Sequence, residues 1–285
     1  MSAPATLTLT QASRGPRELP FIGYGTYKVP PEDTARLVNQ ALVSGYRHLD
    51  TAQMYGNEAE VGQGLRTFLA AHPDVSRDDI FLTTKLDNPN HAPDRVLSTF
   101  AESLAKLGVA EVDLFLIHWP LPAQGDYVRV WQQLLGFLAG GRARSVGVSN
   151  FEIHHLEALG EATGQLPALN QVEMHPHFQN RAVRDWCQAH AIVVEAWSPL
   201  GRGSSLADPV VQQVATELGA TPAQVVLAWH IAHGVSVIPK SSTAERMADN
   251  YAATRLQLSD AQLAAIDALD EGEAGRIGAR PDARS

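Results

Sequence analysis

The sequence has a single cysteine, Cys187, and fewer basic than acidic residues. One cysteine excludes an intrachain disulfide and is typical of a protein from a reducing compartment. The 22 Lys and Arg residues against 31 Asp and Glu residues give a net charge of −9. Such a chain is a poor general partner for nucleic acid or an anionic membrane. Any site that binds an anion must therefore be a local exception on an acidic protein.

Long hydrophobic runs are also missing. No apolar stretch approaches the roughly 20 residues that a membrane-spanning helix needs. The first residues, MSAPATLTLTQASRGP, lack the basic and apolar regions of a secretory signal. We therefore expect a cytoplasmic protein that does not associate with membranes.

Short apolar runs alternate with longer helical patterns along the chain. Eight of these runs are predicted strands: 21–27, 46–50, 80–85, 112–118, 143–149, 168–173, 192–197 and 235–240. Nearly continuous apolar runs are typical of parallel strands that are buried on both faces. Eight β-then-α units in about 250 residues predict an α/β fold, the closed (β/α)8 TIM barrel. An N-terminal β-hairpin of residues 6–10 and 17–20 should precede it.

The chain lacks the glycine fingerprint of the main alternative fold, a doubly wound open sheet. Gly23-Tyr-Gly25 has no third glycine, and Gly62-Gln-Gly64 lies inside a predicted helix. No linker divides the chain, so we expect one barrel domain over residues 1–285, with an irregular C-terminal tail over 271–285. Capping-box spacing marks four helix starts, at Asn57, Thr221, Ser242 and Ser259.

Four chemically distinct side chains lie at or just after the ends of successive predicted strands. Asp50, Lys85 and His118 end the second, third and fourth strands, and Tyr55 follows Asp50 by five residues. Barrel active sites lie at the C-terminal ends of the strands, so these groups should converge on one rim. Lys85 would pair with Asp50, and Tyr55 would protonate a carbonyl oxygen that His118 orients.

The ammonium of Lys85 is expected to tune the acidity of Tyr55. An ammonium about 4 Å from a phenol is worth roughly 4 kcal/mol at an effective dielectric constant of 20. This attraction could lower a tyrosine pKa by up to about three units, although desolvation opposes it. We therefore expect a tyrosine that can exchange its proton near neutral pH.

A tyrosine that acts as an acid on a carbonyl group needs a hydride donor, and no side chain supplies hydride. Barrels often bind phosphate after strands 7 and 8, near a helix N-terminus. The segment Lys240-Ser-Ser-Thr-Ala-Glu-Arg246 follows the eighth predicted strand, and Ser242 is the expected cap of the next helix. This basic segment predicts a phosphate-bearing cofactor at the rim that carries Tyr55.

Two histidine pairs raise the question of a metal site. Adjacent histidines on a helix, His154 and His155, should point apart, and no cysteine or acidic set completes a site with them or with His175 and His177. We therefore predict no metal. Cys187 has no activating base nearby in the sequence, so we do not expect it to be a nucleophile.

Eight segments between residues 18 and 278 resemble the aldo-keto reductase family. They are GYRHLDTAQMYGNEAEVG (45–62), LTTKL (82–86), VDLFLIHWP (112–120), SVGVSNF (145–151), NQVEMHP (170–176), WSPLG (197–201), TPAQVVLAWH (221–230) and IPKSSTAERMADN (238–250). The resemblance implies an oxidoreductase that reduces carbonyl groups with NADPH. It also places the family's catalytic tetrad on Asp50, Tyr55, Lys85 and His118.

The resemblance further implies the residues that bind the two ligands. The positions that match the family's cofactor contacts are Gly25, Thr26, Asp50, Ser149, Asn150, Gln171, Trp197, Ser198, Leu200, Gly201, Lys240, Ser241, Thr243, Arg246 and Asn250. Among them, Lys240 to Arg246 match the segment for the 2′-phosphate of NADPH, and Trp197 matches the aromatic residue that stacks on the nicotinamide. The implied substrate-binding residues are Tyr27, Tyr55, His118 and Trp119.

Within the family, the chain is most similar to bacterial members that reduce 2,5-diketo-D-gluconate, mainly over residues 127–159. The loop after Trp119 and the tail after Asp270 are short, which favours an open pocket and a broad range of aldehydes, ketones or oxo sugars. We expect a monomer whose partner is a small carbonyl compound. Two alternatives stay open from the sequence: a non-catalytic NADPH-binding module, and a phosphate-binding barrel isomerase that uses no nicotinamide.

Overall fold

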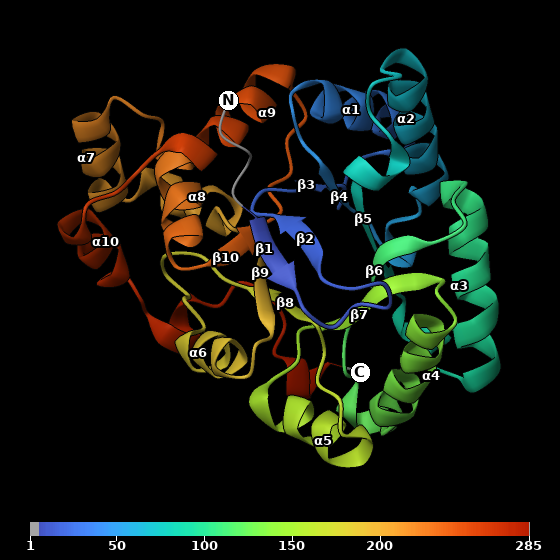
Figure 1. The fold of residues 1–285 in the computed structure, drawn as a ribbon. Coiled ribbons are helices and arrows are strands. Elements are labelled where there is room, and N and C mark those ends of the chain that lie inside the picture. Colours follow the sequence, from blue (N-terminus) through green and yellow to red (C-terminus); the bar gives the residue numbers. More distant parts are fainter. Residues whose placement is uncertain (1–5, 285) are drawn as a thin grey trace.

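Eight parallel strands form a closed ring in the computed structural model, which describes residues 6–284 (Figure 1). The strands are β3 (Tyr24–Gly25), β4 (His48–Asp50), β5 (Phe81–Leu86), β6 (Val112–Ile117), β7 (Ala143–Ser149), β8 (Leu169–Glu173), β9 (Val193–Trp197) and β10 (Val235–Val237). Neighbouring strands in the chain pair in parallel. A bridge between Ile22 and Val237, with the Gly23 amide donating to the Val237 carbonyl at 2.8 Å, closes the ring. The predicted barrel and all eight predicted strands are therefore confirmed.

Helices surround this ring (Figure 1). They are α1 (Pro31–Val43), α2 (Glu58–Ala71), α3 (Pro93–Leu107), α4 (Tyr127–Ala139), α5 (Ile153–Thr163), α6 (Arg181–Ala189), α7 (Pro209–Leu218), α8 (Pro222–Ala232), α9 (Ala244–Ala252) and α10 (Asp260–Asp267). Their buried apolar faces pack on the outer faces of the strands and form one large core. None of the described helices is long and apolar enough to cross a membrane.

The N-terminal hairpin closes the end of the barrel at which the strands begin. It consists of β1 (Thr6–Leu9) and β2 (Arg17–Pro20), paired antiparallel as predicted, and lies across the centre of the ring in Figure 1. Leu9 and Leu19 are fully buried in a cluster with Phe81 and other barrel residues. The hairpin thus fills this end of the barrel, and the active sites of such barrels lie at the opposite end, where the strands finish.

One buried carboxylate fixes the hairpin to the barrel. Asp113, at the start of β6, accepts hydrogen bonds from Arg17 Nε at 2.9 Å, Arg77 Nη2 at 2.9 Å and the Leu82 amide at 3.0 Å. It has no exposed surface. Two cations and one amide therefore satisfy this charge beneath the barrel.

The side-chain caps agree with the sequence at two of the four predicted positions. Thr221 and Ser259 form complete capping boxes, with Gln224 and Gln262. The prediction for Ser242 is wrong, because α9 begins one residue later and Thr243 accepts from the Arg246 amide. At Asn57 the predicted helix start is confirmed, because Asn57 is the N-cap residue of α2, but its side chain makes no cap bond and donates instead to the carbonyls of Thr26 and Val29.

Candidate active site

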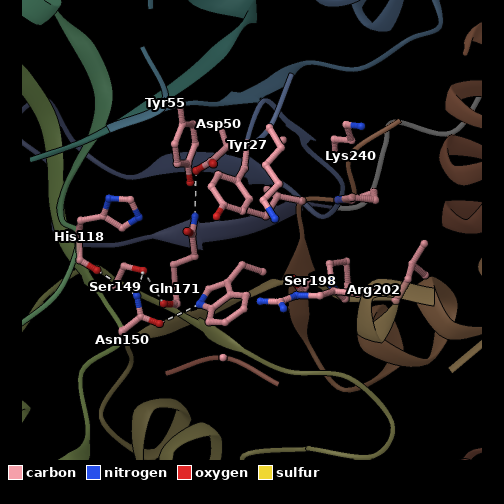
Figure 2. Close-up of a pocket in the computed structure, with 18 of the residues that line it drawn as sticks. Tyr27, Asp50, Tyr55, His118, Ser149, Asn150, Gln171, Ser198, Arg202 and Lys240 are labelled. Atoms are coloured by element: carbon pink, nitrogen blue, oxygen red, sulfur yellow. Dashed lines mark hydrogen bonds between the residues drawn. The ribbon is translucent and has the colours of Figure 1, made fainter. Parts of the chain in front are cut away.

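A cavity of about 580 Å³ opens at the C-terminal ends of the barrel strands. Figure 2 shows its two ends: His118, Asn150 and Tyr55 lie on one side of the view, and Lys240 and Arg202 lie on the other. The candidate residues come from different strand ends, such as Asp50 of β4 and Ser149 of β7. The parallel barrel therefore brings together residues that are far apart in the sequence.

Lys85 is the centre of the polar cluster in this cavity wall. Its ammonium, which has no exposed surface, donates to Asp50 Oδ1 at 2.6 Å, to the Thr51 carbonyl at 3.1 Å and to the Tyr55 hydroxyl at 3.2 Å. All three N–H donors of the ammonium are thus used. The predicted contacts of Lys85 with Asp50 and Tyr55 are both present.

The pKa of Tyr55 differs from the expectation. Burial raises the pKa of Tyr55 to about 12, although the neighbouring Lys85 ammonium lowers it. The expected net lowering of the Tyr55 pKa is therefore wrong, because desolvation outweighs the attraction of Lys85. Burial works against the charge of Lys85, but Asp50 and Tyr55 outweigh it and the pKa of Lys85 is raised. Tyr55 is consequently protonated at neutral pH and Lys85 is charged.

His118 faces Tyr55 in this cavity, with the two ring centroids 5.8 Å apart. Burial, with smaller contributions from the charges of Lys85 and Arg284, holds the pKa of His118 well below its usual value. The imidazole is therefore neutral at physiological pH and carries one N–H donor. A phenol and an imidazole, both neutral and both capable of donating, thus border the same space.

Gln171 connects this cluster to a second buried carboxylate. Its Nε2 donates to Asp50 Oδ2 at 2.9 Å and to Glu195 Oε1 at 2.8 Å. Both amide hydrogens are therefore occupied, which fixes the orientation of the side chain and leaves its oxygen as the acceptor. Glu195 lies in the middle of β9 and also accepts from Ser236 Oγ at 2.9 Å. Nothing in the apolar run 192–197 had marked Glu195 as part of the site.

The residues expected to bind the nicotinamide lie together in the structure. Trp197 Nε1 donates to Asn150 Oδ1 at 2.8 Å, and Asn150 Nδ2 donates to the His118 carbonyl at 2.9 Å and to Ser149 Oγ at 3.0 Å. Ser149 Oγ in turn donates to the Gln171 carbonyl at 2.9 Å. These bonds tie the floor of the cavity to the backbone of His118.

Most of the predicted site residues line the cavity. They are Gly25, Tyr27, Asp50, Tyr55, His118, Trp119, Ser149, Asn150, Gln171, Trp197, Ser198, Leu200, Lys240 and Arg246. Lys85 lies behind them, within hydrogen-bond reach of Asp50 and Tyr55. Five further predicted cofactor residues are not among the lining residues: Thr26, Gly201, Ser241, Thr243 and Asn250. Of these, Ser241 and Asn250 are buried and bonded to each other, with Asn250 Nδ2 donating to Ser241 Oγ at 3.1 Å.

Sequence reasoning missed several lining residues. They are Lys28, Met54, Pro199, Arg202, Gly203, Leu206, Ile238, Pro239, Gly278, Ala279 and Arg284. The last three belong to the tail, which forms 3₁₀ turns at Gly272–Gly275 and Pro281–Ala283 and borders the cavity. The positive charge of Arg284 was the available signal that the tail could border the cavity. The shortness of the tail had instead suggested an open pocket.

The helical histidine pair does meet an acidic residue, contrary to expectation. His154 Nε2 and His155 Nε2 lie 3.1 and 3.2 Å from Asp282 Oδ1 of the tail. His155 Nδ1 already accepts from the Glu152 amide at 3.1 Å, so the proton of this neutral ring is on Nε2. With its proton on this nitrogen, His155 offers no lone pair to a metal, and Nε2 makes no hydrogen bond within the described residues although it lies close to the carboxylate. The cluster serves to anchor the tail.

Known proteins are similar to this chain in both sequence and fold. An aldo-keto reductase of Mycolicibacterium smegmatis is 45% identical over 94% of each chain. The methylglyoxal reductase DkgA of Salmonella typhimurium is 40% identical over 93% of this chain and 94% of its own. The crystal structure of a Gox0644 variant in complex with NADPH aligns over 100% of both chains, with a TM-score of 0.92 and 40% identity.

The sequence model described as the aldo/keto reductase family matches residues 21–271 of the chain. The matched region includes every strand of the barrel and the four residues Asp50, Tyr55, Lys85 and His118. The chain belongs to the aldo/keto reductase family.

Proposed function

We propose that the protein is an NADPH-dependent carbonyl reductase that converts aldehydes and ketones, including oxo sugars such as 2,5-diketo-D-gluconate, to alcohols. The observation that carries the proposal is the bond from the buried Lys85 ammonium to the Tyr55 hydroxyl at 3.2 Å, beside a neutral His118. A protonated phenol and a neutral imidazole can both donate to one carbonyl oxygen. Relatives named as methylglyoxal reductase support carbonyl reduction.

The residues of the cavity fit NADPH. The cationic groups Arg202, Lys240 and Arg246 line its far end, and the acidic lining residue, Asp50, is paired with Lys85. Lys240 and Arg246 would hold the 2′-phosphate, and Ser149, Asn150 and Gln171 the carboxamide. The complex of the similar Gox0644 variant with NADPH supports NADPH as the cofactor.

When bound in this cavity, NADPH would supply the hydride that reduces the carbonyl carbon. Tyr55 donates its proton to the carbonyl oxygen, and this transfer is favourable because an alkoxide is a stronger base than a phenolate. Lys85 stabilises the phenolate that remains, and Asp50 keeps Lys85 charged. His118 orients the carbonyl through its N–H, since its lowered pKa leaves it neutral.

The substitution Tyr55→Phe tests this role. It removes one hydroxyl, so turnover with NADPH and a small aldehyde should fall by about 10²–10⁴-fold. The affinity for NADPH, measured by the quenching of tryptophan fluorescence, should change little. Tyr251→Phe is the matched control, because Tyr251 lies in α9, packs on Tyr46 and does not line the cavity. Full turnover by Tyr55→Phe would refute the proposed mechanism.

The alternative is a non-catalytic NADPH-binding module of the same fold. It predicts that the wild-type protein quenches on NADPH addition but never consumes the cofactor with any aldehyde or ketone. Loss of NADPH absorbance on adding a generic aldehyde therefore separates the two functions. The complete cluster of Asp50, Tyr55, Lys85 and His118 favours the enzyme, because a binding module has no need of a proton donor there.

A further inference from the structure

We propose that Arg284 is a specificity-determining residue that binds a carboxylate group of the substrate. The cavity would then favour carbonyl compounds that carry a carboxylate over uncharged ones of the same shape. This inference rests on the proposed function, because it assigns a substrate class to the same cavity. It concerns the end of the cavity opposite to Lys240.

Arg284 lies on the substrate side of the cavity. It lines the space with His118 and Trp119, and its guanidinium carbon is 5.3 Å from the centroid of the Trp119 ring. Its charge contributes to the lowered pKa of His118, so the guanidinium and the imidazole share one environment. An anion bound by Arg284 would consequently lie beside the carbonyl group that Tyr55 and His118 hold.

The guanidinium has no carboxylate partner among residues 6–284. Its Nε is buried without a hydrogen-bond partner in this part of the chain. Other tail arginines differ: Arg276 lies 2.7 Å from Glu273, and Arg280 lies 3.3 Å from the same carboxylate. A buried donor left without an acceptor is destabilising, because its lost hydration is not replaced. A ligand that supplies the acceptor would remove this destabilisation.

Four contacts, two to Glu173 and two from Asp282, hold the tail that carries Arg284. Both oxygens of Glu173 accept from tail amides, Ile277 at 2.6 Å and Gly278 at 2.8 Å. Asp282 lies between the two helical histidines, 3.1 Å from His154 and 3.2 Å from His155. The guanidinium is therefore placed before the substrate arrives, which reduces the entropy lost on binding.

The approach at Gly278 shows how closely the tail packs. A Cβ at this position would lie 2.4 Å from Glu173 Oε2 and 2.5 Å from the Trp197 ring, so only glycine fits without a shift. The tail thus contacts Trp197, which borders the cofactor side, and continues to Trp119 on the substrate side.

The chemistry of Arg284 favours a carboxylate. A guanidinium is planar and can donate two parallel N–H bonds to the two oxygens of a carboxylate. The cations at the far end, Lys240 and Arg246, are assigned to the cofactor phosphate, so they do not compete for this group. Arg284 supplies one positive charge beside Trp119, which matches the single charge of a carboxylate, and the other lining cation, Lys28, lies 5.4 Å from the centroid of the Tyr27 ring.

The experiment compares two aldehydes of similar shape, 4-carboxybenzaldehyde and methyl 4-formylbenzoate, with NADPH as reductant. For the wild type, kcat/KM should be about tenfold or more higher for the carboxylate. Arg284→Gln should lower that value by about 10–100-fold, mainly through KM, because about 1.4–2.8 kcal/mol of charge-assisted bonding is lost. The ester should change by less than about twofold, since an ester makes no ion pair. Arg284→Lys should restore part of the preference.

Arg280→Gln is the matched control. Arg280 carries the same charge in the same tail, pairs with Glu273 and does not line the cavity. Arg280→Gln should leave kcat/KM unchanged for both aldehydes. Equal losses for both aldehydes in Arg284→Gln, or no preference in the wild type, would overturn the assignment. If the wild type consumes NADPH with neither aldehyde, the proposed function itself fails, a result distinct from a loss of discrimination.

Discussion

The substitution Lys85→Met tests the energetic role of the buried ammonium. Lys85 and Asp50 form an ion pair at 2.6 Å with side chains that have at most 1% exposed surface. At an effective dielectric constant of 20, the attraction at this distance is about 6 kcal/mol. Removing one partner of a buried pair typically costs about 3–5 kcal/mol, because the other charge is left without compensation. We expect a loss of this size in the free energy of unfolding, measured by urea denaturation at neutral pH.

The double variant Asp50→Asn with Lys85→Met is the control for that loss. It removes both charges, and the asparagine oxygen can still accept from Gln171, as Asp50 does in the wild type at 2.9 Å. The double variant should therefore be about 1–3 kcal/mol more stable than Lys85→Met alone. A single variant that loses less than about 1 kcal/mol, or a double variant that is no more stable, would refute the argument.

The pH dependence of the unfolding free energy gives a second measurement on the same variants. Burial raises the pKa of Asp50 and the Lys85 ammonium opposes it, so removing Lys85 should raise this pKa further. A carboxyl group whose pKa is higher in the folded than in the unfolded protein stabilises the fold at low pH and loses that effect as the pH rises through the folded value. Lowering the pH from about 7.5 to about 5.5 should therefore reduce the difference in unfolding free energy between the single and double variants, by up to about 1.4 kcal/mol per pH unit.

Two further predictions concern the cofactor end and the base of the barrel. Lys240→Ala should weaken NADPH binding by about tenfold or more and NADH binding much less, because only NADPH carries the 2′-phosphate; equal losses in fluorescence titrations would remove the assignment. Asp113→Asn should lower the unfolding free energy by about 3 kcal/mol, because Arg17 and Arg77 lose a fully buried carboxylate. An unchanged urea midpoint would contradict that role of Asp113.

The strands and the cluster around Lys85 could be predicted because both depend on local sequence. Continuous apolar runs mark strands that are buried on both faces, and a polar residue that ends such a run must lie at the rim. The strand register then determines which side chains are neighbours. Asp50 on β4 pairs with Thr83 on β5, two residues before Lys85. The side chains of Asp50 and Lys85 therefore lie on the same face of neighbouring strands and can meet.

The acidity of Tyr55 could not be predicted, because it depends on a balance between two large opposing effects. The attraction of Lys85 follows from the sequence pattern, but the degree of burial follows only from the packed cavity. Burial prevails over the attraction, and the pKa of Tyr55 rises to about 12. The helix start near Ser242 failed for a similar reason, since three adjacent hydroxyl residues offer equivalent caps and only the backbone path selects Thr243.

The tail shows the limit of composition as a guide. Its Gly, Ala and Arg residues predict no regular element, and that inference says nothing about whether the segment is held in place. The bonds that hold it come from acceptors about a hundred residues earlier, as in the pairing of the Gly278 amide with Glu173. Because such contacts depend on the closed barrel, they appear only once the strand ends are in position. The acidic composition of the whole chain is equally uninformative about the cavity, which is lined by the cations Lys28, Arg202, Lys240, Arg246 and Arg284.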